Sequence, residues 1–94
     1  MTMKSTAYSS SDKGVSGITA SGMKATRDPN GTSTVAVDPR VIPLGTKLYI
    51  EGYGYAIACD TGSAIKGNKV DVYFNSVKEC YSWGSRNVDV YILE

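Results

Sequence analysis

Short runs of β-branched and aromatic residues, divided by glycine, proline, asparagine and aspartate, are the feature that most restricts the fold of this chain. Runs of this kind have the composition of strands, and the residues between them have the composition of turns. The pattern is typical of an all-β sandwich or barrel. It predicts strands over residues 5–9, 32–37, 46–51, 55–59, 69–74 and 88–93.

Alternation of side chains is clearest in the runs at residues 34–37 and 70–74. In the second run Asp71 shares a face with Tyr73, opposite Val70, Val72 and Phe74. Aspartate is disfavoured in strands, so an acid within a strongly β-forming run is a candidate functional residue. The alternative is a solvated Asp71 that faces outward from an edge strand.

The segments between the runs predict turns. Residues 38–45 contain two prolines, which lack a backbone donor and restrict the residue before them, so this segment is expected to turn into the next strand. Residues 51–55 contain two glycines and predict a hairpin. Residues 9–31 are rich in serine, glycine, threonine and asparagine and predict a loop, with one further strand near residues 17–20.

One short helix is expected over residues 76–83. Ser76 can cap its first turn, Glu79 at the third helical position can complete a capping box, and Gly84 can end the helix. Trp83, the single tryptophan, is expected in the core rather than at a sugar-stacking position.

Length and composition limit the classes of protein to consider. With 94 residues and 41% apolar residues, the chain can close one modest core, so residues 1–94 are expected to form a single domain. A formal charge of +1 with no basic stripe argues against nucleic-acid binding. No apolar run approaches the ~20 residues of a membrane span, and no signal peptide is evident. The chain is therefore expected to be either a cytosolic product released by other means, such as a phage enzyme, or a fragment of an exported protein.

Histidine is absent, which excludes Ser-His-Asp catalysis, Cys-His catalysis and histidine-based metal sites. Carboxylates are the remaining candidates for catalysis, ahead of lysine or tyrosine. Cys59 and Cys80 are too few for a disulfide scaffold and lack the spacing of a zinc site. They are expected to be two buried thiols, with a disulfide between them as the alternative.

Asp60 is the second candidate acid, because it follows the apolar run at residues 56–59 and precedes Thr61 and Gly62. A carboxylate at the end of a buried strand needs a hydrogen-bonded partner or a raised pKa. The alternative is that Asp60 only starts a turn. A single Asp-Thr-Gly triplet does not make an aspartic protease, which needs two. Asp38, before a proline, has the weakest local signal, and the remaining aspartates are expected to be loop or surface acids.

Several spaced blocks of the sequence together form a recognisable pattern. They are residues 35–39 (VAVDP), 42–46 (IPLGT), 52–54 (GYG), 58–62 (ACDTG), 65–67 (IKG), 70–74 (VDVYF) and 83–84 (WG). This pattern resembles the 3D domain, named for three aspartates, which is similar to the catalytic barrel of MltA-type lytic transglycosylases and occurs in bacterial stationary-phase survival and cell-wall proteins. The resemblance extends from residue 6 to residue 93.

The resemblance implies a six-stranded double-psi β-barrel in which Asp38, Asp60 and Asp71 are the three aspartates and Asp71 is the catalytic acid/base. It implies cleavage of the β-1,4 bond between N-acetylmuramic acid and N-acetylglucosamine of peptidoglycan, with formation of a 1,6-anhydro product and without a cofactor. We expect the other two carboxylates to keep a proton on Asp71 and to orient it, as one coupled group. The expected substrate contacts are Tyr8, Thr61, Gly62, Lys66 and Tyr73.

The sequence also departs from the family pattern. Ser63 stands where a second glycine is usual, and Cys59 and Cys80 stand where small residues are common. The second domain that walls the sugar cleft in MltA-type enzymes is missing, so we expect either a monomer with an open groove or a homodimer that completes it. The implied location is the cell wall or the extracellular space. Two other functions stay open: a non-catalytic, expansin-like wall-binding module, and a divalent-cation site built by the three carboxylates.

Overall fold

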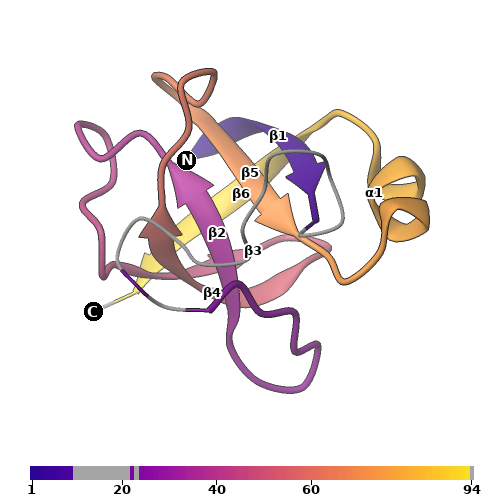
Figure 1. The fold of residues 1–94 in the computed structure, drawn as a ribbon. Coiled ribbons are helices and arrows are strands. Elements are labelled where there is room, and N and C mark those ends of the chain that lie inside the picture. The colour runs from indigo at the N-terminus through magenta and orange to yellow at the C-terminus, as the bar shows by residue number, and fades with distance from the viewer. Residues whose placement is uncertain (10–21, 23, 94) are drawn as a thin grey trace.

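A computed structural model describes residues 1–9, 22 and 24–93, which form a closed six-stranded β-barrel with one short helix (Figure 1). The elements are β1 (Thr2–Tyr8), β2 (Ser33–Val37), β3 (Lys47–Ile50), β4 (Gly54–Asp60), β5 (Lys69–Tyr73), α1 (Val77–Trp83) and β6 (Arg86–Leu93). The all-β prediction is confirmed, and each of the six predicted strands is present, although β1 has a different start. The further strand expected near residues 17–20 lies outside the described residues. The one described helix is too short to cross a membrane.

The first strand differs from the sequence prediction, because β1 begins at Thr2 and not at residue 5. Met3 is fully buried in the barrel and pairs with Val88 of β6. Thr2 and Lys4 are exposed on either side of it, so the alternation of a strand extends to the start of the chain. Residues 2–4 were not predicted as strand because two of the three are polar, and only Met3 faces inward.

The strands follow one another around the barrel in the order β1-β5-β2-β4-β3-β6. Two neighbouring pairs, β1 with β5 and β2 with β4, are parallel, and the other pairs are antiparallel. This mixture of parallel and antiparallel pairs in a closed six-stranded barrel agrees with the barrel that the family resemblance implies. Strands far apart in the sequence thus become neighbours, and β5 lies between β1 and β2.

The core fills the inside of the barrel with the inward-facing side chains of all six strands. Those that are less than 1% exposed are Val35, Val37, Leu48, Ile50, Ala58, Val70, Val72 and Val90. Each large apolar side chain buried in this way stabilises the fold by roughly 1.5–3 kcal/mol. Val70 and Val72 occupy inward positions of β5, so Asp71, which alternates with them, lies on the outer face.

An aromatic cluster of Tyr53, Phe74 and Trp83 adjoins the core, and ring centroids within it are 5.4–5.9 Å apart. The Trp83 indole donates a 3.0 Å hydrogen bond to the Ser5 hydroxyl, which satisfies two buried polar groups. The Arg27 guanidinium stacks 4.0 Å from the centre of the Tyr53 ring. The predicted core position of Trp83 is confirmed.

Ser76 caps the start of α1 and Gly84 ends it as predicted, whereas the Glu79 carboxylate meets the Ser76 hydroxyl group and not the Ser76 backbone N–H of a capping box. The Ser76 hydroxyl accepts a hydrogen bond from the Glu79 backbone N–H and donates one to the Glu79 carboxylate. Gly84 ends the helix with a positive φ of 68°. Figure 1 shows α1 at one side of the barrel, where it packs mainly against β1. Cys59 and Cys80 remain thiols; Cys59 is buried as predicted, whereas Cys80 is half-buried.

Candidate active site

Asp60 and Asp71 lie on the two strands that flank β2. Ala36 of β2 pairs with Asp60 of β4 on one side and with Asp71 of β5 on the other. Neighbouring strands are about 5 Å apart, so the backbones of the two acids are separated by about two strand spacings. Residues that pair directly across a sheet present their side chains on the same face. The two carboxyl groups therefore face the same outer surface of the barrel.

A β-bulge sets the orientation of Asp60. Val35 pairs with Ala58, but the next residue of β2, Ala36, pairs with Asp60 and not with Cys59. In a regular ladder Ala36 would have faced Cys59, and the carboxyl group of Asp60 would have been directed to the other face. One extra residue in β4 thus directs the acid toward the outer surface, which is a common use of bulges beside active sites.

Asp71 is held by a neighbouring hydroxyl group. It pairs with Thr6 of the parallel strand β1, and the Thr6 hydroxyl donates a 3.0 Å hydrogen bond to Asp71 Oδ1. Both side chains are half-buried. Asp71 is therefore oriented from the β1 side while it remains accessible to solvent.

Asp60 is held by a tyrosine and by the backbone. The Tyr8 hydroxyl donates to Asp60 Oδ2 at 3.3 Å, and the Thr61 backbone N–H donates to Asp60 Oδ1 at 2.9 Å. The Tyr8 ring is in edge contact with the ring of Tyr73, at a centroid distance of 5.4 Å.

The pKa of Tyr8 is raised by burial and by nearby negative charges. Burial raises this pKa well above its usual value, and the charges of Asp60, Asp71 and Cys59 raise it further. Both candidate carboxylates therefore act on the same hydroxyl group, which stays protonated and stays a donor at neutral pH. Tyr8 thus donates a hydrogen bond to Asp60 and lies within the field of Asp71.

Asp38 has different partners. Its side chain is 2% exposed and forms an ion pair with Arg40, whose Nη2 and Nε lie 3.0 and 3.2 Å from the two carboxylate oxygens. The backbone N–H of Gly67 donates to Asp38 Oδ2 at 2.9 Å. The Arg40 side chain, and then the N–H groups of Gly67 and Arg40, hold the pKa of Asp38 well below its usual range. Asp38 thus remains ionised and joins the turn after β2 to the loop before β5.

The structure therefore brings two of the three predicted aspartates to one surface around a shared tyrosine, and ties the third to an arginine. Within residues 1–9, 22 and 24–93, no three histidine, cysteine, aspartate or glutamate side chains are placed to hold a metal ion. The geometry gives no support to a cation site built by the three carboxylates.

The predicted substrate contacts fall into two groups. Tyr8 and Tyr73 lie with the two acids on the outer face, although Tyr73 is only 4% exposed. Thr61 and Lys66 are exposed in the loop between β4 and β5, and Gly62 is half-buried there. The backbone N–H of Gly67, at the end of this loop, donates the hydrogen bond to Asp38 that was described above.

Two features explain the shape of this loop. A side chain at Gly62 would approach Ile65 Cγ1 to 3.0 Å, so glycine leaves the room that the turn needs. Ser63 has no positive φ, so the turn does not require the second glycine that is usual in the family.

Sequence reasoning missed Thr6, although Thr6 shares the alternation of Tyr8 in β1. It also missed a pocket between β1 and α1, which we call the β1 pocket. This pocket has a volume of about 290 Å³. Its lining consists of Thr6, Ala7, Val77, Cys80, Tyr81 and Gly84. Because Thr6 bonds Asp71, the pocket borders the candidate site. No local pattern in the sequence indicates that β1 pairs with β5, so the contact between Thr6 and Asp71 could not be predicted.

Comparisons with known proteins identify the family of the chain. The family model of the 3D domain matches residues 33–94. Over 93 residues, which is 99% of this chain, the chain is 56% identical to YabE and 50% identical to YocH, both of Bacillus subtilis (strain 168). YabE is named as a cell wall shaping protein and YocH as a cell wall-binding protein. The chain spans 23% and 32% of the lengths of these two relatives.

The fold is also similar to that of solved structures. The crystal structure of MltA from E. coli superposes with a TM-score of 0.64 at 26% identity, over 82% of this chain and 27% of the MltA chain. A variant of the same protein, described as a lytic transglycosylase, superposes equally well at 24% identity. The second likeness supports the fold alone.

Proposed function

The chain belongs to the 3D domain family, and from this premise we propose that it is a peptidoglycan lytic transglycosylase with Asp71 as general acid/base. One observation carries the proposal: Asp60 and Asp71 flank the same residue of β2, face the same surface and act on one tyrosine hydroxyl group. Cleavage of a glycosidic bond typically uses two carboxyl groups that are accessible to the substrate. The likeness to MltA supports the same reaction.

The reaction needs one proton donor and no water. Asp71 in its acid form gives its proton to the glycosidic oxygen as the bond to C1 of N-acetylmuramic acid breaks. The C6 hydroxyl group of the same sugar attacks C1, and its proton passes to the Asp71 carboxylate. The product is the 1,6-anhydro sugar, and Asp71 is again protonated. Thr6 orients Asp71 throughout, because its hydroxyl group donates to Oδ1.

Asp60 and Asp38 support this chemistry in different ways. Asp60 holds the Tyr8 hydroxyl group toward the sugar and places negative charge beside the developing cation at C1. Asp38 acts as a positioning residue, because its contacts with Arg40 and Gly67 fix the loop that carries Thr61 and Lys66. This loop and the two tyrosines Tyr8 and Tyr73 contact the glycan.

The substrate setting follows from the same premise. The glycan lies along the outer face of β1 and β5, with the β1 pocket beside Asp71. The other wall of the groove comes from a further part of a longer protein or from a second copy of the chain. The proposed location is the cell wall.

A non-catalytic wall-binding module is the second candidate function. Two observations favour it: the relative YocH is named as a cell wall-binding protein, and three exposed tyrosines form a row across the outer face of β4, β3 and β6. Tyr49 is 5.0 Å from Tyr55 and 6.3 Å from Tyr91 between ring centroids. Exposed aromatic rings offer apolar faces to sugar rings.

Digestion of purified peptidoglycan separates the two functions. The wild-type protein should release 1,6-anhydro-muropeptides that mass spectrometry detects, and Asp71→Asn should lower the rate by roughly 100-fold or more. Asp89→Asn is the matched control, because Asp89 accepts a hydrogen bond from Thr2 at the start of β1, whereas Asp71 is bonded to Thr6 near the other end of that strand. Full activity of Asp71→Asn would remove Asp71 from the chemistry. Sedimentation of the wild-type protein with sacculi without any anhydro product would favour binding alone.

A further inference from the structure

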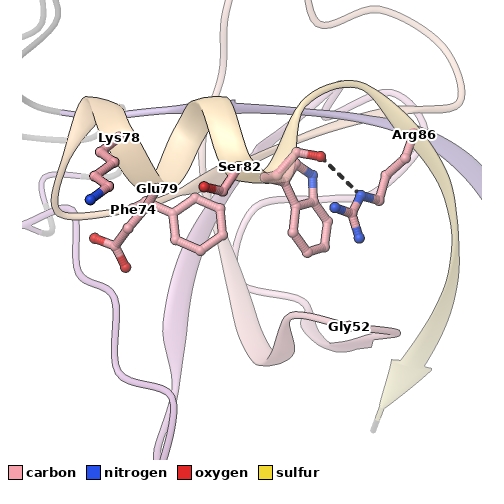
Figure 2. A pocket seen from close by; sticks show the side chains of 7 residues that line it. Gly52, Phe74, Lys78, Glu79, Ser82 and Arg86 are labelled. Carbon is pink, nitrogen blue, oxygen red and sulfur yellow. Dashed lines mark hydrogen bonds between the residues drawn. The ribbon is translucent and has the colours of Figure 1, made fainter.

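A second pocket lies on the other side of α1, against the turn between β3 and β4; we call it the α1 pocket (Figure 2). It has a volume of about 340 Å³. Its lining residues are Gly52, Phe74, Lys78, Glu79, Ser82, Trp83 and Arg86. None of them belongs to the candidate active site.

The inner wall of this pocket is aromatic. Trp83 is 7% exposed and Phe74 is 8% exposed, and their ring centroids are 5.8 Å apart. Gly52 approaches the indole with a positive φ of 82°, and a side chain there would reach van der Waals contact with the ring. The wall is therefore apolar and is held in place by the core behind it.

Arg86 is fixed beside this wall. Its guanidinium carbon lies 4.2 Å from the centre of the Trp83 ring, and its Nε donates a 3.0 Å hydrogen bond to the Trp83 carbonyl oxygen (Figure 2). These two contacts set the plane of the guanidinium group. Nε is its one donor with an acceptor among the described residues, which leaves the two terminal nitrogens for a ligand. A guanidinium group held in this way is preorganised to bind a carboxylate with two hydrogen bonds.

The charges at the rim add to this preference. In Figure 2, Lys78 and Arg86 lie at opposite ends of the pocket, with Phe74 between them. Glu79 is the acid among the lining residues, and its carboxylate accepts the Ser76 hydroxyl hydrogen bond at the helix cap. The lining thus has two cations and one acid, and the acid already serves the helix cap. The pocket favours an anion that also carries apolar groups.

We propose that the α1 pocket binds a free carboxylate of the peptide stem of peptidoglycan. This inference rests on the proposed function, because it takes peptidoglycan as the ligand. Within that ligand, the peptide stems carry carboxylates next to aliphatic groups, whereas the N-acetylglucosamine units are neutral and polar. Arg86 binds the carboxylate, Lys78 contributes charge, and Phe74 and Trp83 contact the aliphatic part.

The position of α1 makes the two sites compatible. Val77, Cys80 and Tyr81 face the β1 pocket beside Thr6, whereas Lys78, Ser82 and Trp83 face the α1 pocket. The helix and its side chains are about 10 Å across. A glycan on the Asp71 side can therefore extend a peptide arm past α1 to Arg86.

Isothermal titration calorimetry with the soluble stem tetrapeptide tests the proposal without any glycan. The wild-type protein should bind the free peptide, and Arg86→Gln should weaken binding by roughly 10- to 100-fold, because a charge-assisted pair of hydrogen bonds is lost. Lys78→Gln should weaken it by a smaller factor. Lys47→Gln is the matched control, because it removes the same charge from an exposed site on β3 and should leave the affinity unchanged.

The same peptide with every carboxyl group amidated is the second arm. It leaves the protein unchanged, so it decides the question even if Arg86→Gln does not fold. The wild-type protein should bind the amidated peptide as weakly as Arg86→Gln binds the free peptide. Equal affinity for the free and amidated peptides would overturn the proposal. If wild-type protein released no anhydro product but bound the free peptide through Arg86, the catalytic proposal would fail and this one would stand.

Discussion

The Tyr53 hydroxyl group offers a quantitative test of how the barrel is held behind the candidate site. Tyr53 is 3% exposed, and its hydroxyl group donates to the backbone carbonyl oxygen of Tyr73 at 2.5 Å and lies 3.4 Å from that of Thr34. Tyr53→Phe removes this donor and leaves a buried carbonyl group with one fewer partner. The loss should lower the free energy of unfolding by about 2 kcal/mol at neutral pH. For a folded chain of this size, the melting temperature should fall by about 10 °C.

The same hydroxyl group has a pH signature. Burial raises the pKa of Tyr53 from 10.0 to about 12. A group whose pKa is raised by folding stabilises the folded state below its unfolded pKa, and this stability is lost as the pH rises toward the folded pKa. Between pH 10 and 12 the wild-type protein should therefore lose on the order of 2 kcal/mol of stability through Tyr53. The raised pKa of Tyr8 acts in the same direction, so Tyr53→Phe should reduce this loss without abolishing it.

Urea denaturation at pH 7, 10 and 11.5 measures both effects on the same samples. Tyr55→Phe is the matched control, because Tyr55 is 57% exposed on the outer face of β4. Its free energy of unfolding should stay within about 0.5 kcal/mol of wild type at neutral pH. The reasoning would be refuted if Tyr53→Phe had wild-type stability at pH 7 and lost as much stability as wild type above pH 10.

Three further outcomes are expected. Asp38→Asn should lower the free energy of unfolding at neutral pH and should make this free energy fall less steeply in acid. The reason is that the lowered pKa of Asp38 contributes stability that is present above pH 4 and is lost as the pH falls; urea denaturation at pH 7 and pH 3 measures the two effects. Replacing Tyr49 and Tyr91 together by alanine should reduce the fraction of protein that sediments with sacculi if the tyrosine row binds glycan, while the rate of anhydro-product release from soluble substrate should not change. Cys59 and Cys80 should both react with a thiol reagent after denaturation without reductant, and reductant should leave the melting temperature unchanged.

Local pattern was sufficient to predict the strands but not their neighbours. The alternation of Val70 and Val72 with Asp71 in β5 predicted which side chains enter the core, and both valines are fully buried. The pairing of β1 with β5 joins residues that are about two thirds of the chain apart, and no feature of either strand specifies the other. The barrel and its parallel pairs were therefore accessible only through the resemblance to a family. The contact between Thr6 and Asp71 was missed for the same reason.

The three aspartates differ in how far their roles could be predicted. The outward direction of Asp71 follows from simple alternation with Val70 and Val72, and the structure agrees. The direction of Asp60 could not follow from alternation, because the bulge opposite Ala36 shifts the register of β4 by one residue.

The partner of Asp38, by contrast, is close to it in the sequence. Its partner Arg40 is only two residues away, and the arginine neutralises a carboxylate that burial alone would have made costly. A charge neutralised in this way cannot strongly favour a proton on a neighbouring acid, so the expectation of three coupled carboxylates has little physical basis for Asp38. What remains on the outer face is Tyr8, whose hydroxyl group donates to Asp60 and whose pKa is raised by burial and then by the charges of Asp60 and Asp71. The proposed chemistry therefore depends on the register of β4 against β2, because the bulge that sets this register directs Asp60 to the face of Asp71.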